Sequence, residues 1–133
     1  MSENCRYGYD RTLEDVTFDA ALEQVTAALK EEGFGVLTEI DVKATLKKKI
    51  DVDFRRYRIL GACNPVLAHK ALSSELHLGL LLPCNVVVFE DDGGRVTVSL
   101  VKPAEMFKVV DNPELEAIAG EVDEKLRRVR DAL

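Results

Sequence analysis

The spacing of apolar residues along the chain predicts an alternation of strands and helices. Apolar positions recur every three or four residues in two long segments, which is typical of helices with one buried face. Alternating or Val-rich runs bounded by turn residues indicate five strands. The predicted strands are 7–13, 34–40, 56–63, 84–90 and 95–101, and the predicted helices are 18–32, 41–49, 65–76 and 113–133.

Short local signals place the ends of these elements. Gly33 supplies a left-handed stop after the first helix. Asn64-Pro65 and Asn112-Pro113 each combine a capping side chain with a proline suited to the first helical position. The turn residues 91–94, Asp-Asp-Gly-Gly, predict that the last two strands form an antiparallel hairpin. Gly61, inside the third strand, indicates a bulge or the close approach of another group.

The length and composition fit one α+β domain spanning residues 1–133. A chain of 133 residues with 47% apolar composition can bury a core without disulfides or a metal. The order of elements is β-α-β4-α with short inserted helices, and residues 1–6 are expected to fray.

Charge and cysteine usage narrow the classes of partner. The net charge of −6 argues against a nucleic-acid partner, because nucleic-acid-binding surfaces are usually strongly basic. No apolar run reaches the roughly 18 residues of a membrane span and no signal peptide is indicated, so we expect a cytoplasmic protein without a membrane partner. Three cysteines without zinc-type spacing fit reduced thiols.

The predicted helix 41–49 and the residues after it form the basic region of this acidic chain. A solvated face is the simplest interpretation, and capture of an anion or an acidic partner is the functional alternative. The apolar residues expected on the inner side are Val42, Leu46 and Ile50, and the basic residues are Lys43, Lys47, Lys48, Arg55, Arg56 and Arg58.

The candidate chemistry lies between Gly61 and Asn85, where two Cys-Asn pairs, each beside a proline, bracket one helix. If the third and fourth strands are antiparallel neighbours, the end of one lies beside the start of the other. Cys63, Asn64, Cys84 and Asn85 would then meet at one rim of the sheet, with His69 or His77 close by.

Four interpretations of this rim compete. The cysteines can be buried core residues and the asparagines caps. The rim can bind a small anionic or apolar ligand, with Asn64, Asn85 and the helix start supplying polar contacts. It can perform thiol chemistry, because a helix start favours a thiolate at Cys63 and Cys84 could resolve the product. It can hold zinc through Cys63, Cys84 and His69, although no close-spaced pair of ligands supports a metal.

Several stretches resemble the prokaryotic domain-of-unknown-function family 302. The resemblance rests on a Gly-Phe turn at 33–34, the segment YRILGACNP at 57–65, the helix AHKAL at 68–72 and the strand LLPCNV at 81–86. It implies a curved, mainly antiparallel sheet of about five strands gripped by helices, similar to the TATA-box-binding-protein class. The family carries no assigned activity.

These observations favour non-catalytic binding of a small ligand or a protein partner at the rim. Thiol-based redox or metal-dependent catalysis by Cys63 and Cys84 is the alternative, so whether the chain is an enzyme stays open. The sequence contains no phosphate-loop, dinucleotide or GxSxG motif and names no cofactor. We also expect a homodimer, because small sheet domains with an exposed edge often pair.

Overall fold

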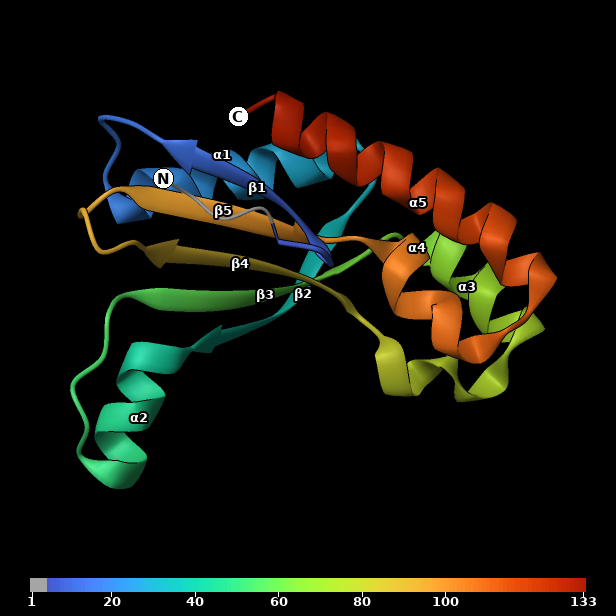
Figure 1. Ribbon diagram of the computed structural model, residues 1–133, viewed down its shortest axis with the longest axis horizontal. Coiled ribbons are helices and arrows are strands. Elements are labelled where there is room, and N and C mark those ends of the chain that lie inside the picture. Colours follow the sequence, from blue (N-terminus) through green and yellow to red (C-terminus); the bar gives the residue numbers. More distant parts are fainter. Residues whose placement is uncertain (1–4) are drawn as a thin grey trace.

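The computed structural model describes residues 5–133 and contains the predicted succession of strands and helices (Figure 1). The sequence predicts fraying over residues 1–6, and residues 1–4 of that range lie outside the described residues. The strands are β1 (Gly8–Leu13), β2 (Gly35–Asp41), β3 (Tyr57–Cys63), β4 (Cys84–Glu90) and β5 (Val96–Val101). The α-helices are α1 (Phe18–Glu31), α2 (Val42–Ile50), α3 (Pro65–Ser74), α4 (Pro103–Met106) and α5 (Pro113–Asp131), with 3-10 helices η1 (Leu76–Leu81) and η2 (Phe107–Val110).

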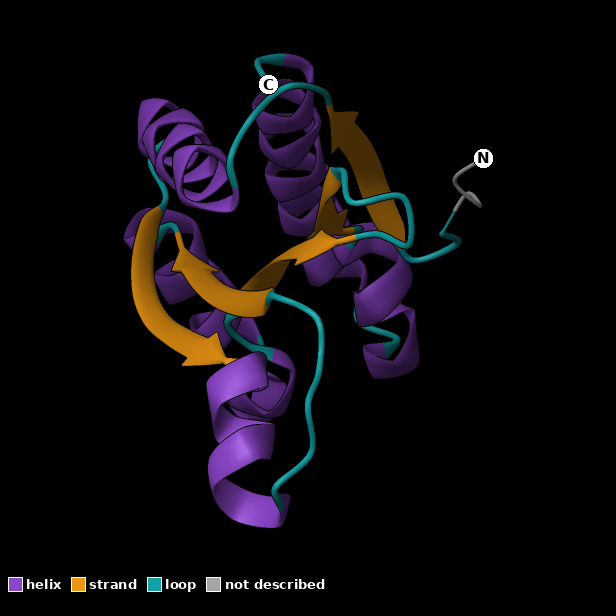
Figure 2. Ribbon diagram, turned by 90° about the vertical axis from the view of Figure 1, so that its left-hand side faces the viewer, coloured by secondary structure: helices purple, strands orange, loops and turns teal. Residues whose placement is uncertain are grey.

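The five strands form one sheet in the order β1-β5-β4-β3-β2, and every neighbouring pair is antiparallel. This arrangement confirms the predicted α+β class and the hairpin between β4 and β5. Helices α1 and α5 lie on one face of the sheet, whereas α2 projects away from both of them (Figures 1 and 2). The second face is therefore left without cover from the two long helices.

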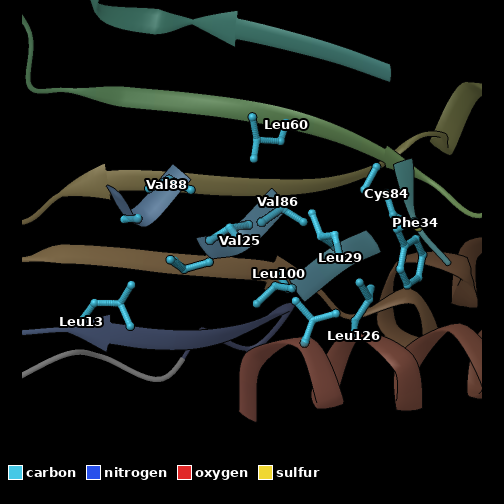
Figure 3. Packing of buried hydrophobic residues seen from close by; sticks show 14 of the residues in the cluster. Leu13, Val25, Leu29, Phe34, Leu60, Cys84, Val86, Val88, Leu100 and Leu126 are labelled. Carbon is cyan, nitrogen blue, oxygen red and sulfur yellow. The ribbon is translucent and has the colours of Figure 1, made fainter. Parts of the chain in front are cut away.

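The main core lies between the sheet and helices α1 and α5 (Figure 3). Alternate residues of the central strands point into it because side chains alternate across a strand. A second cluster of buried residues joins α3, η1, η2 and α5 at the end of the sheet. Core residues include Val25, Leu29, Leu60, Val86, Val88, Val98, Leu100 and Leu126, and the second cluster contains Ala71, Leu78, Phe107, Leu115 and Ala119.

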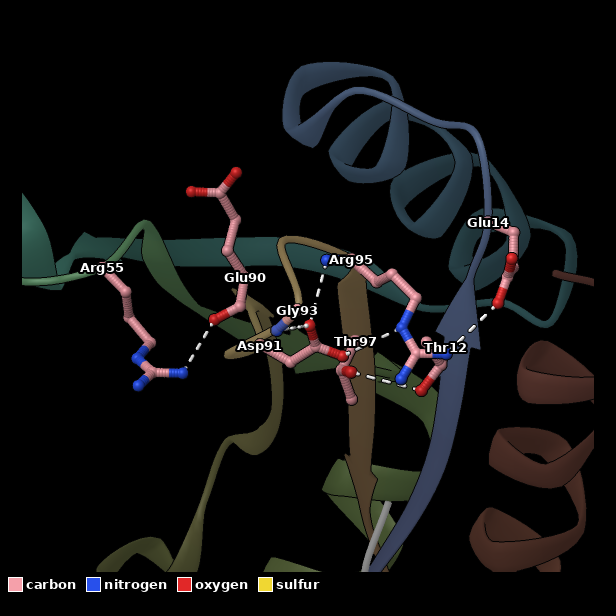
Figure 4. A network of polar contacts seen from close by, with 8 residues as sticks. All are labelled: Thr12, Glu14, Arg55, Glu90, Asp91, Gly93, Arg95 and Thr97. Carbon is pink, nitrogen blue, oxygen red and sulfur yellow. Dashed lines mark hydrogen bonds and ion pairs between the residues drawn. The ribbon is translucent and has the colours of Figure 1, made fainter. Parts of the chain in front are cut away.

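The polar turn between β4 and β5 is fixed by its first aspartate (Figure 4). The backbone N–H groups of Gly93 and Arg95 both donate to Asp91 Oδ1 at 2.9 Å. The Arg95 side chain reaches Glu14 beyond the neighbouring strand β1, with 3.2 Å between nitrogen and oxygen. The Asp91 carboxylate thus satisfies two backbone N–H groups of the turn, as is typical of an aspartate at the start of a turn.

Two segments differ from expectation. Helix α2 has no buried residue, and Ile50 is 63% exposed, so the prediction that Ile50 lies on an inner side is wrong. The segment after α3 forms the 3-10 helix η1, which the apolar run alone did not reveal. Within residues 5–133, no helix combines the length and apolar character needed to cross a membrane.

Candidate functional site

The antiparallel pairing of β3 and β4 brings the two Cys-Asn segments to one end of the sheet. Ala62 pairs with Cys84, the first residue of β4, and Cys63 directly follows Ala62 as the last residue of β3. Asn64 then caps α3, because its side-chain oxygen accepts from the Leu67 N–H at 3.3 Å. The predicted helix start at Asn64-Pro65 is thus confirmed, and so is the neighbouring position of the two cysteine segments.

Gly61 allows the chain to pack closely at this end of the sheet. A Cβ atom built on Gly61 would collide with Thr38 Oγ1 and would lie 2.7 Å from Pro83 Cγ. On β2 the register shifts between Val36 and Thr38, which leaves Leu37 as an extra residue in the strand. The predicted close approach at Gly61 is therefore confirmed, and the bulge lies on the adjacent strand.

A cavity of about 330 Å³ lies beside these strand ends. Its walls come from the beginning of β2, the end of β3, helices α3 and α5, and the segments around η1 and η2. It borders both hydrophobic clusters, because Phe34, Leu67 and Cys84 belong to the main core whereas Ala71 and Phe107 belong to the second cluster. Phe34 and Cys84 lie together at one end of the main core in Figure 3.

The cavity wall is almost entirely apolar. Among the described residues, none of the side chains lining it is charged, and the polar groups are the Thr38 hydroxyl, the Asn64 amide and the thiols of Cys63 and Cys84. The Asn64 amide already caps α3 and also donates to the Glu32 carbonyl oxygen at 3.5 Å. A neutral, largely apolar molecule therefore matches this wall better than an anion does.

The cavity has a buried floor and an exposed mouth. Phe34, Ala71 and Phe107 are buried and form part of the floor. Leu37, the extra residue of β2, lines the opening and is 68% exposed, and Gly79 of η1 is also exposed. An apolar molecule could thus enter past an apolar lip.

The environment of Cys84 opposes thiolate chemistry. Burial, with a smaller contribution from nearby Cys63, raises the pKa of the Cys84 thiol from 9.0 to about 11. The thiol is therefore protonated at neutral pH, and a protonated thiol is a poor nucleophile and metal ligand. Both Cys63 and Cys84 are free thiols in the structure.

Two candidates lie away from the cavity. Asn85 pairs with Gly61, is exposed and, being next to Cys84 in a strand, points to the opposite face of the sheet. His69 is exposed on α3 and does not line the cavity. Asn85 and His69 therefore do not line the cavity together with Cys63, Asn64 and Cys84.

The zinc alternative of Cys63, Cys84 and His69 is not assembled either. Within residues 5–133, no group of three or more His, Cys, Asp or Glu side chains is placed to hold a metal ion. His77 is exposed after α3 and is likewise absent from the cavity wall.

The C-terminal part of the chain contributes residues that the sequence interpretation missed. Phe107 from η2 and Ile118 and Val122 from α5 complete the cavity wall. The helical spacing of apolar residues indicates that Ile118 and Val122 face inward, but it does not indicate that they line a cavity. Their position beside the cysteines depends on how α5 packs across the sheet, and local patterns do not encode that.

Comparison with known proteins gives a consistent result. The family model described as Domain of unknown function DUF302 matches residues 9–133. The chain is also similar to a solved structure, that of an uncharacterized conserved DUF302 protein from Bacillus stearothermophilus. The two share 29% sequence identity with a TM-score of 0.88, over 96% of this chain and 98% of that chain. No curated protein matches the chain.

Proposed function

The chain belongs to the family described as Domain of unknown function DUF302, and we propose that this member binds a small apolar ligand, without catalysis, in the cavity beside Cys63 and Cys84. The observation that carries this proposal is a cavity with an apolar, uncharged wall, a buried floor and an exposed mouth.

The size of the cavity limits the ligand. Its volume of about 330 Å³ is at the lower end of the range of ligand pockets in proteins. At roughly 30 Å³ for each heavy atom, by analogy with liquid water, about ten heavy atoms fit. A bicyclic aromatic molecule or a medium-length acyl chain has this size.

The wall also supports a binding role over catalysis. An apolar ligand would gain dispersion contacts with both hydrophobic clusters and remove apolar surface from water. The thiol alternative needs Cys84 to resolve a product formed at Cys63, and the protonated Cys84 is a poor nucleophile for that step at neutral pH. The thiol and zinc alternatives therefore have less support than binding.

Thermal denaturation with 2-naphthol as the probe tests the proposal. A ligand at about a hundred times its Kd stabilises the folded state by about 2.7 kcal/mol, which corresponds to several degrees in Tm. We expect 2-naphthol to raise the Tm and inorganic phosphate, the anionic probe, to leave it unchanged.

A pair of alanine variants locates the effect. Ala68→Leu places a larger side chain in the cavity from a half-buried position on α3, and it should abolish the rise in Tm. Ala27→Leu makes the same change at an exposed position of α1 and should preserve the rise. An unchanged wild-type Tm at the solubility limit of 2-naphthol, or an equal rise in Ala68→Leu, would contradict the proposal.

A further inference from the structure

The face of the sheet opposite α1 and α5 carries an apolar patch on its two central strands. Tyr57 of β3 pairs with Phe89 of β4, and their rings stack with 5.4 Å between centroids. Ile59 and Val87 pair two residues further along the same strands, on the same face. The Phe54 ring lies 6.2 Å from that of Tyr57. We define the open-face patch as Phe54, Tyr57, Ile59, Val87 and Phe89.

Helix α2 is the second feature whose apolar side chains are not buried within the described chain. It has nine residues, none of them buried, and it projects away from α1 and α5 (Figures 1 and 2). Its last residue, Ile50, is 63% exposed, and Val52 just after it is 41% exposed. A nine-residue helix is marginal in water without tertiary packing. An additional surface that packs against α2 would therefore stabilise it.

We propose that the chain forms a symmetric homodimer in which α2 of each copy covers the open-face patch of the other. A two-fold axis makes this contact reciprocal. The dimer therefore covers α2 and the open-face patch of both copies. At about 1.5 Å per residue, α2 is roughly 13 Å long. Three spacings between strands of about 4.8 Å amount to about 14 Å, so the helix can reach from β3 to β1 across the sheet.

The distribution of charge favours a second copy of this chain as the occupant. The net charge of the chain is −6, and α2 contributes four lysines and no acid, so the remaining residues carry −10. Two copies therefore repel each other overall, but α2 of one copy is attracted to the acidic body of the other.

Specific groups are available for this attraction. Within residues 5–133, Lys48 and Lys49 make no ion pair. Asp10 lies on β1 and accepts a hydrogen bond from the Ser99 hydroxyl, with 2.5 Å between the oxygens, and it also makes no ion pair within the described part of the chain. Ser99 alternates with the buried Val98 and Leu100, so Asp10 lies on the open face. Lys48 and Lys49 of one copy complement Asp10 of the other.

Sedimentation velocity of the full chain over a concentration series tests the dimer. We expect the wild type to dimerise, and Ile50→Glu to raise the dissociation constant by about tenfold or more, because the variant places a charge against the apolar patch. Leu76→Glu is the matched control, since Leu76 is 83% exposed on η1, outside both surfaces. It should dimerise like the wild type.

A charge exchange provides a second, independent measurement. Lys48→Glu combined with Lys49→Glu should weaken the dimer, and adding Asp10→Lys to this double variant should restore it. Circular dichroism of each variant checks that it is folded. A wild type that stays monomeric at every concentration, an Ile50→Glu variant that associates like Leu76→Glu, or a charge exchange without restoration would overturn the proposal.

Discussion

Replacing Gly61 with alanine perturbs the point where three strands and the cavity wall meet. Gly61 pairs with Thr38 on one side and Asn85 on the other. The added methyl group would collide with the Thr38 hydroxyl and would lie 2.7 Å from Pro83 Cγ, closer than real Cβ contacts. Since Thr38 and Pro83 both line the cavity, relief of the collision must move its wall.

The expected cost follows from this crowding. Inserting a methyl group into a well-packed site destabilises a protein by about 1–3 kcal/mol, and we expect a value near 2 kcal/mol here. Removing the Thr38 hydroxyl relieves the tighter of the two contacts, while the Pro83 contact remains. In a Thr38→Ala background, Gly61→Ala should therefore cost about 1 kcal/mol less than in the wild type.

Urea unfolding at one fixed protein concentration measures these differences as changes in midpoint at constant m-value. Gly35→Ala is the matched control, because a Cβ on this β2 glycine meets nothing within 4 Å. It should change the free energy of unfolding by less than about 0.5 kcal/mol. The reasoning fails if Gly61→Ala is as stable as Gly35→Ala, or if its cost is the same with and without the Thr38 hydroxyl.

Three further predictions concern individual side chains. Asn64→Ala should lower the free energy of unfolding by about 1 kcal/mol in urea titrations through loss of the α3 cap, whereas the exposed Asn85→Ala should change it by less than about 0.5 kcal/mol. Because the folded pKa of Cys84 is raised to about 11, the unfolded state loses this proton first as the pH rises above 9.0. The stabilisation that depends on this proton is present in full below about pH 8 and is lost as the pH rises through 11. Between pH 8 and 11 the wild type should therefore lose about 2 kcal/mol more than Cys84→Ala, as chemical unfolding at each pH would show. Tyr9→Phe removes the hydroxyl that donates to Asp123 Oδ2 at 2.6 Å, and since Asp123 is only 8% exposed, calorimetry should show a loss of about 1–3 kcal/mol. A neutral result for Asn64→Ala, for the Cys84 comparison or for Tyr9→Phe would contradict the corresponding contact, and a loss of about 1 kcal/mol in Asn85→Ala would contradict its assignment as an exposed residue.

The elements that the sequence predicts well are those specified by local chemistry. Asn64-Pro65 and Asn112-Pro113 start helices because a side-chain cap and a proline act within one turn. Gly33 follows α1 with a φ of +86°, a conformation that glycine adopts without strain. The turn from Asp91 closes the β4–β5 hairpin through its own backbone N–H groups.

The candidate site was predictable only in part. Antiparallel pairing places Cys63 near Cys84, but strand alternation turns Asn85 to the face of the sheet opposite Cys84. Cys63 lines the cavity although it alternates with Ala62, because the chain leaves the sheet there to enter α3. Phe107 and Val122 reach the cavity through packing across the whole chain, for which no short motif exists.

The central claim is that an apolar molecule enters the cavity between the two hydrophobic clusters. An NMR titration of the isotopically labelled full chain with 2-naphthol tests it most directly, because chemical shifts report the location of binding. We predict saturable shifts of the amide signals of Ala62, Leu67, Ala71 and Val122, which line the cavity. An absence of shifts up to the solubility limit, or shifts confined to the open-face patch, would contradict the account.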